Sequence, residues 1–371
     1  MRFLAESAKK SFKYFVMRIL SFFAALFFLC SSALAAGEAV PATAYFPVLP
    51  LNAPEDAQAQ LVPLAMNRSL DIVHDDVMRA IIVIHDETRD ATAALAMMAA
   101  LAGSQNSSTV ILAPQFLLPS DIVRFSDHLP DKGKGFAAWQ VLGWSLGNDS
   151  MPIPSRKSVS SFTVVDFLLM YLSDRNIFPN LDTIVIAGHG VGANFVQRYA
   201  ALTAAADILE KQNIKLRFVA AGATSYLYQT ASRPMGGKKG FGLSDAAACP
   251  SVNAYPYGLE KLNPYGRHVG ANSVKINYAL RFITYLYAQA IDAVPDASCA
   301  AMAQGNSSAS RAENYRMYLR TLYSDIAGKT QTFAKSNEGV NDAISLFGSA
   351  CGMESLFGEG MCPPSMGAVQ N

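Results

Sequence analysis

The sequence predicts an α/β fold with a mostly parallel central sheet and helices on both faces. Short, wholly apolar runs rich in β-branched residues alternate with helical patterns from about residue 78 onward. Strands that are apolar throughout are typical of parallel sheets, whose two faces are both buried. The helical segments between these runs supply the crossover connections that parallel strands need.

The expected elements follow one another in a regular order. The first helix is expected to begin at Asp90 and to end at Gly103, because these residue types favour the N-cap and the C-terminal end of a helix. Residues 229–272 break the order as a long excursion without a clean period, which is usually a functional or capping segment. Strands are predicted at 79–86, 108–115, 181–188, 214–223, 279–289 and 329–335, and helices at 90–103, 161–175, 191–209, 307–326 and 341–348.

Residues 1–35 have the pattern of a secretory signal peptide. A basic stretch precedes the apolar run from Ile19 to Leu29, and Ala33-Leu34-Ala35 gives a small-x-small cleavage site. The apolar run is shorter than the roughly 20 residues that span a bilayer. We therefore expect residues 36–371 to form a single exported domain, periplasmic or secreted, with no stable membrane span after cleavage. An uncleaved anchor is the alternative, and Met17 is an alternative start.

The charge of the chain does not indicate a polyanionic partner. The full sequence has 30 basic and 29 acidic residues, and cleavage after Ala35 removes five and one of them, leaving 25 and 28. A chain so close to neutrality lacks the basic excess that nucleic acids or anionic membranes attract. We expect no nucleic-acid partner.

Four cysteines remain after cleavage: Cys249, Cys299, Cys351 and Cys362. An even number in an exported chain predicts two disulfides, for which three pairings exist. The short loop between Cys351 and Cys362 favours that pair, which leaves Cys249 with Cys299. No Cys-x-x-Cys or neighbouring histidine suggests zinc, so we expect neither a metal nor a cofactor.

The stretch TIVIAGHGVGANFV, residues 183–196, has three interpretations. Gly188, Gly190 and Ala193 fit the dinucleotide pattern G-x-G-x-x-A, whereas Gly188 and Gly192 fit the outer glycines of the nucleophile elbow G-x-S-x-G. A tight turn needed only for strand–helix packing is the third. A dinucleotide site needs an acidic residue at the end of the next strand, which here ends in AAGATS. The elbow is therefore favoured.

Residues 75–350 resemble the α/β-hydrolase superfamily, in particular a branch of secreted or envelope serine-hydrolase-like proteins. This resemblance implies an α/β-hydrolase fold with a nucleophile after the fifth strand, an acid after a later strand and a histidine last. The matching segments are IHDETRDA, LAPQFL, GWSLGNDS, GHGVGANFVQRYA, TSYLY, CPSVNAYPYGLEKLNPY, SCAAMAQG and GVNDAISLFGSACG.

The resemblance implies that the triad positions are Gly190, Asp292 and Asn341. Glycine has no side chain with which to attack a carbonyl, so the serine chemistry is lost at this position. Residues 269–371 contain no histidine, so the loss of the catalytic base does not depend on the alignment. The five histidines of the chain are His74, His85, His128, His189 and His268.

The expected oxyanion site is altered as well. The loop after the third strand reads His85-Asp86-Glu87, which puts two carboxylates where negative charge should be stabilised. The amide of Val191, at a helix start, is expected to point into the site and to bind an anion or a carbonyl. His189 and Ser225 are further candidates for the pocket.

These observations predict a catalytically silent, exported protein that binds a small molecule or a protein through the remnant pocket. One alternative is an esterase-like hydrolase that uses relocated residues, namely Asp86, Glu87, His189 and Asp292. Another is a purely structural envelope protein.

Overall fold

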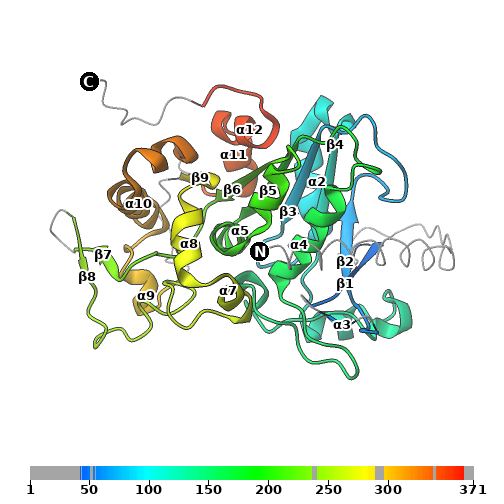
Figure 1. The fold of residues 1–371 in the computed structure, drawn as a ribbon, viewed down its shortest axis with the longest axis horizontal. Helices are drawn as coiled ribbons and strands as arrows, with labels where there is room; N and C mark the ends of the chain where they lie inside the picture. The colour runs from blue at the N-terminus through cyan, green and yellow to red at the C-terminus, as the bar shows by residue number, and fades with distance from the viewer. Residues whose placement is uncertain are drawn as a thin grey trace. The chain divides into compact units, whose positions relative to one another are not determined.

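An eight-stranded sheet in the order β1-β2-β4-β3-β5-β6-β9-β10 forms the centre of the protein (Figure 1). The computed structural model describes residues 42, 44–50, 53–54, 56–235, 240–288, 296–336 and 340–362. The predicted signal peptide, residues 1–35, lies outside the described residues. The strands are β1 (Ala44–Val48), β2 (Gln60–Met66), β3 (Arg79–Ile84), β4 (Thr109–Pro114), β5 (Thr183–His189), β6 (Lys215–Ala221), β9 (Phe282–Ala288) and β10 (Gln331–Ser336).

The pairing of the strands confirms the prediction of a mostly parallel sheet. β1 pairs with β2 and β2 with β4 in antiparallel fashion, whereas all other neighbours in this sheet are parallel. In parallel sheets the carboxyl ends of the strands meet at one edge, which is where such folds place their sites. The loops after β3, β5 and β6 therefore lie together.

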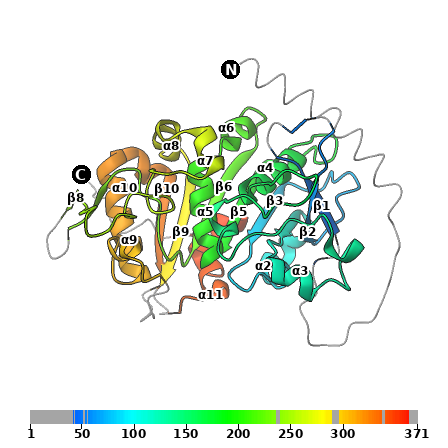
Figure 2. The same cartoon turned by 90° about the horizontal axis from the view of Figure 1, so that it is seen from below.

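Helices cover both faces of the sheet (Figure 2). Along β5, Ile184 and Ile186 pack into one apolar cluster, whereas Val185 and Ala187 pack into the cluster on the opposite face. The first face carries α4 (Ser161–Leu172), α5 (Val191–Leu202), α8 (Ala271–Tyr278) and α10 (Ser308–Thr330), and the second carries α2 (Ala91–Ala102), α11 (Ala343–Phe347) and α12 (Ala350–Phe357).

Several helix limits follow from the caps that the sequence indicated. The Asp90 side chain accepts a 2.8 Å hydrogen bond from the backbone N–H of Ala93, and Gly103 ends α2 with a φ of 51°. The predicted helix 191–209 is wrong as a single element, because Thr203 has an extended backbone and its hydroxyl accepts from the N–H of Ala205. The chain therefore restarts as α6 (Ala205–Glu210).

The excursion (residues 229–272) contains more regular structure than its sequence indicated. A two-stranded hairpin is formed by β7 (Ser232–Pro234) and β8 (Phe241–Leu243), and α7 (Pro264–Val269) leads into α8. The remaining elements are α3 (Pro119–Arg124), α9 (Cys299–Met302) and 3-10 helices at Gly103–Ser107, Pro130–Gly133 and Trp144–Leu146.

Both favoured cysteine pairs form disulfides. Cys249 bonds to Cys299, which joins the excursion to α9, and Cys351 bonds to Cys362 at the end of the described chain. The prediction of two disulfides with this pairing is confirmed. No helix in the described residues is both long and apolar enough to cross a membrane.

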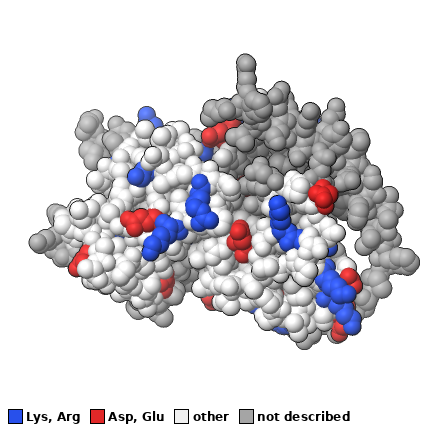
Figure 3. Space-filling model, turned by 60° about the horizontal axis from the view of Figure 1, so that its bottom comes forward, with Lys and Arg blue, Asp and Glu red and all other residues white. Residues whose placement is uncertain are grey.

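The surface shown in Figure 3 carries few charged side chains, and the basic and acidic ones are interspersed. No charge of one sign therefore accumulates on that face.

Candidate functional site

The turn between β5 and α5 has the backbone geometry of a sharp strand-to-helix elbow. Gly190 adopts φ 57° and ψ −115°, a conformation that is costly for residues with a side chain. Its N–H donates a 2.9 Å hydrogen bond to the carbonyl of Ala221, and its carbonyl accepts from the N–H of Asn194 at 3.1 Å. The turn is thus held on one side by β6 and on the other by the first turn of α5.

The two outer glycines of this turn are required by close packing. A Cβ atom at Gly188 would lie 2.4 Å from the carbonyl oxygen of Gly192. A Cβ atom at Gly192 would lie 2.5 Å from the carbonyl oxygen of Ile84 and 2.6 Å from that of His85. A Cβ atom at Gly190 would meet no atom of the described chain within 4 Å. The elbow (residues 188–192) is therefore tight at both ends, and its central position faces open space.

Asn341 lies beside the elbow. The Nε2 atom of His189 donates a 2.8 Å hydrogen bond to the backbone carbonyl of Asn341. Both residues border Gly222, because a Cβ atom there would lie 3.0 Å from Asn341 Oδ1 and 3.1 Å from His189 Nε2. Two of the three positions given by the resemblance, 190 and 341, are thus close in space. The third, Asp292, lies outside the described residues.

His85 is a buried, neutral residue at the end of β3. Its Nδ1 donates to the carbonyl of Asp86 at 2.8 Å, and its Nε2 accepts from the backbone N–H of Phe116 at 3.0 Å. The ring centroid lies 4.5 Å from that of Trp144. Burial lowers the pKa of His85 to about 4, so the imidazole is uncharged at neutral pH and holds the following loop in place.

The β3 loop (residues 85–90) carries the two predicted carboxylates on its outer side. Asp86 Oδ1 accepts hydrogen bonds from the backbone N–H and the hydroxyl of Thr88, at 2.9 and 2.6 Å. Glu87 is exposed, and its carbonyl accepts from the Arg89 guanidinium. Arg89 is fixed by a 2.8 Å ion pair with Asp121. Within the described residues, no group of three or more His, Cys, Asp or Glu side chains is placed to hold a metal ion.

Ser225 and Val191 have different positions relative to the surface. Ser225 is buried, and its hydroxyl accepts a 3.0 Å hydrogen bond from Arg198 Nη2. Val191 is half-buried and is the first residue of α5, where backbone N–H groups have no intrahelical acceptor. Ser225 thus supports the site from behind, whereas Val191 presents its amide at the start of the helix.

Asn194 and Arg198 are supporting residues that the sequence did not reveal. Asn194 Oδ1 accepts from the backbone N–H groups of Thr224 and Ser225, which attaches the loop after β6 to α5. Arg198 is buried, and its Nη1 donates to the carbonyl of Asn194. Both residues lie within three helical turns of the elbow, but the side-chain partners that they hold, Thr224 and Ser225, are about 30 residues away, beyond the reach of a local pattern.

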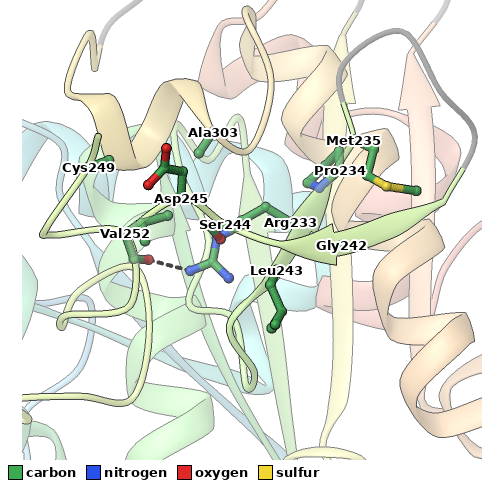
Figure 4. A pocket seen from close by; sticks show the side chains of 10 residues that line it. All are labelled: Arg233, Pro234, Met235, Gly242, Leu243, Ser244, Asp245, Cys249, Val252 and Ala303. Carbon is green, nitrogen blue, oxygen red and sulfur yellow. Dashed lines mark hydrogen bonds between the residues drawn. The ribbon is translucent and has the colours of Figure 1, made fainter. Parts of the chain in front are cut away.

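A cavity of about 320 Å³ lies under the β7–β8 hairpin and not at the elbow (Figure 4). We refer to it as the hairpin cavity. The residues that line it come from the hairpin, the following loop and α9 with its C-cap: Arg233, Pro234, Met235, Gly242, Leu243, Ser244, Asp245, Cys249, Val252 and Ala303.

Comparison with solved structures identifies the fold. The chain is similar to the LpqC poly(3-hydroxybutyrate) depolymerase from Bordetella parapertussis, with a TM-score of 0.53, 15% identity and coverage of 86% of this chain and 91% of that one. It is also similar to poly(aspartic acid) hydrolase-1 from Sphingomonas sp. KT-1, with a TM-score of 0.50, 19% identity and coverage of 83% and 96%. No protein-family model and no curated protein matches the sequence.

Proposed function

We propose that this chain, which has the α/β-hydrolase fold, is a catalytically silent binding protein built on a hydrolase scaffold. In this proposal Gly190, Asp292 and Asn341 occupy the positions of nucleophile, acid and base. The protein is exported after cleavage of residues 1–35, and residues 36–371 form one domain. It binds a small molecule or a protein segment at the elbow.

The observation that carries this proposal is the combination of an elbow backbone with no side chain at its centre. Gly190 has a φ of 57°, and no atom of the described residues lies within 4 Å of its Cβ position. A serine at this position would present its hydroxyl in this space, whereas glycine has only a hydrogen atom there and cannot attack a substrate. The backbone therefore has the shape of a nucleophile elbow, but the nucleophilic oxygen is absent.

The groups that remain at the elbow favour binding over turnover. The first amides of α5 point out of the helix N-terminus, where they can donate to a carbonyl or an anion. The carboxylates of Asp86 and Glu87 are on the adjoining loop and disfavour the oxyanion that hydrolysis would create. Free amides beside two carboxylates suit a ligand with a neutral carbonyl, such as an intact ester or amide, better than they suit an anion.

The alternative of a hydrolase with relocated residues has less support. The Nε2 atom of His189 already donates a hydrogen bond to the carbonyl of Asn341, and Asp86 Oδ1 already accepts hydrogen bonds from Thr88. Among the described residues His189 and Asp86 are not hydrogen-bonded to each other, and the hydroxyl that Asp86 holds belongs to Thr88 of its own loop, with no histidine bonded to it. Against a purely structural protein stands the open space at residue 190.

A binding measurement tests the proposal. Isothermal titration of mature protein (residues 36–371) with short-chain alkyl esters is expected to give saturable binding without release of acid. The variant Gly190→Leu is expected to abolish binding because its side chain fills the open space, and Leu243→Ala, in the distant hairpin, is the matched control. Binding that survives Gly190→Leu in a folded protein would place the ligand elsewhere.

A further inference from the structure

Three arginines in the half of the protein that contains the excursion are buried among neutral hydrogen-bond acceptors. Arg198, Arg233 and Arg311 are 1%, 2% and 0% exposed. None of them belongs to an ion pair formed by the described residues. Burial lowers the pKa of each guanidinium from its ordinary value, which reflects the cost of removing the charge from water.

Arg198 and Arg311 use their guanidinium groups to hold loops together. Arg311 donates to the backbone carbonyls of Gly305, Thr224 and Asp296 at 2.6–2.8 Å. Arg198 donates to two carbonyls and to the hydroxyl of Ser225. These neutral acceptors satisfy the N–H groups without a direct ion pair, and the Asp296 carboxylate acts on both charges only at longer range.

Arg233 differs because it also lines the hairpin cavity (Figure 4). Its Nη atoms donate to backbone carbonyls, among them those of Val252 and Tyr257, and its guanidinium lies 4.2 Å from the centre of the Tyr228 ring. Its buried Nε has no hydrogen-bond partner among the described residues. A buried cation thus forms one part of the cavity wall.

The rest of the cavity wall is mainly apolar. Pro234, Met235 and Leu243 come from the hairpin, and Val252 and Ala303 from the segments facing it. A volume of about 320 Å³ lies at the lower end of the range of small-molecule sites. Apolar walls combined with one buried cation suit a ligand that has an apolar part and a negative charge.

One acidic residue, Asp245, also lines the cavity, and its charge is partly offset. Asp245 Oδ1 accepts hydrogen bonds from the backbone N–H groups of Ala247 and Ala248. The residue is exposed, so water screens its carboxylate, whereas Arg233 is almost fully buried. The guanidinium is therefore less screened by water than the Asp245 carboxylate.

We propose that the hairpin cavity binds a small amphipathic carboxylate, such as a short-chain fatty acid. Its carboxylate is drawn to Arg233, and its alkyl chain packs against Met235 and Val252. This site is separate from the elbow, so it does not depend on the function proposed for Gly190.

The test measures the binding of hexanoate and of hexanol to the mature protein by isothermal titration and by NMR. We expect saturable binding of hexanoate in the millimolar range or tighter, and at least tenfold weaker binding of hexanol, which has the same alkyl chain but no charge. Ala303→Phe fills the cavity and is expected to abolish binding, whereas Gly190→Ser at the elbow should leave the affinity unchanged.

Two substitutions of opposite charge at one exposed residue test the role of electrostatics without altering Arg233. Leu243 is 84% exposed, so substitutions there should not disturb the fold. Leu243→Glu is expected to weaken hexanoate binding about two- to fivefold and Leu243→Lys to strengthen it by a similar factor, the range of exposed charge pairs. The proposal would be overturned if hexanoate did not bind, or if hexanol bound equally well. It would also be overturned if Ala303→Phe still bound hexanoate, or if Leu243→Glu and Leu243→Lys did not shift the affinity in opposite directions.

Discussion

The imidazole of His189 donates a 2.8 Å hydrogen bond from Nε2 to the backbone carbonyl of Asn341. A carbonyl oxygen can only accept, so this nitrogen carries the proton. The bond joins the last residue of β5 to the segment that precedes α11, and both border Gly222. Asn341 is therefore anchored at the elbow, beside Gly190.

The three glycines of the elbow should respond differently to alanine. Gly188→Ala and Gly192→Ala place a Cβ atom 2.4–2.5 Å from backbone oxygens, so each is expected to lower the free energy of unfolding by about 2–3 kcal/mol or more. Gly190→Ala meets no described neighbour, so only its backbone conformation is unfavourable, at about 1–3 kcal/mol. Urea unfolding followed by circular dichroism measures all three.

Gly328 provides the control for this series. It lies inside α10, and no described side chain is within 4 Å of its Cβ position, so Gly328→Ala should stabilise the protein by up to about 1 kcal/mol. Equal losses of stability at positions 188, 190 and 192 would contradict the packing described for the elbow.

Restoring two side chains should restore some chemistry. The double variant Gly190→Ser with Asn341→His is expected to hydrolyse p-nitrophenyl esters slowly and to be labelled by a fluorophosphonate probe. Adding Asp86→Gly removes a carboxylate from the β3 loop and should raise the rate roughly ten- to hundredfold. Gly190→Ala with Asn341→His lacks the hydroxyl and serves as the inactive control. A folded triple variant that the probe does not label would contradict the assignment of these positions.

Asp166 should make stability depend on pH in an unusual direction. Its Oδ1 accepts from the hydroxyls of Tyr199 and Tyr265, and burial raises the pKa of the carboxyl to about 6. The folded-state pKa is above the unfolded value, so folding favours the protonated form, and this contribution is lost as the pH rises from about 4 to about 6.

Asp166→Asn keeps an oxygen for the two tyrosines and removes the charge. We expect it to stabilise the protein by about 1–3 kcal/mol at pH 7 and to have little effect at pH 4. Asp127→Asn, at an exposed site, is the control. Chemical unfolding across this pH range measures the difference, and a destabilised Asp166→Asn at pH 7 would argue against a buried carboxylate.

His85 should titrate far below an ordinary histidine. Burial lowers its pKa to about 4, so the folded value lies below the unfolded one, and its contribution to stability is lost as the pH falls from about 6.5 to about 4. This sign is opposite to that of Asp166 over the same range. An NMR titration of the ring protons measures the pKa directly, with the exposed His128 as reference, and a pKa of His85 near 6.5 would contradict its burial.

The features that the sequence revealed are those with short-range causes. Gly188 and Gly192 marked the elbow because close contact between β3, β5 and α5 admits only glycine at both positions. The cysteine count and the short Cys351–Cys362 loop indicated both disulfides. The apolar parallel strands were recognised because burial on both faces removes polar residues from them.

The features that were missed depend on distant partners. β1 and β2 each contain a proline, Pro47 and Pro63, which weakens the strand pattern, and they form through antiparallel pairing with each other. The break at Thr203 is local but is hidden within an unbroken helical pattern. No local pattern shows that Arg198, Arg233 and Arg311 are buried among carbonyls, because each also donates to a carbonyl of a loop that it meets only in the folded chain.

The most direct test of the account is the turnover of p-nitrophenyl butyrate by the mature wild-type protein at pH 8, measured alongside fluorophosphonate labelling. With glycine at residue 190, we predict a rate equal to that of heat-denatured protein and no label. Hydrolysis well above that control, with a label on the wild-type chain, would show that a nucleophile is present and would contradict the central claim.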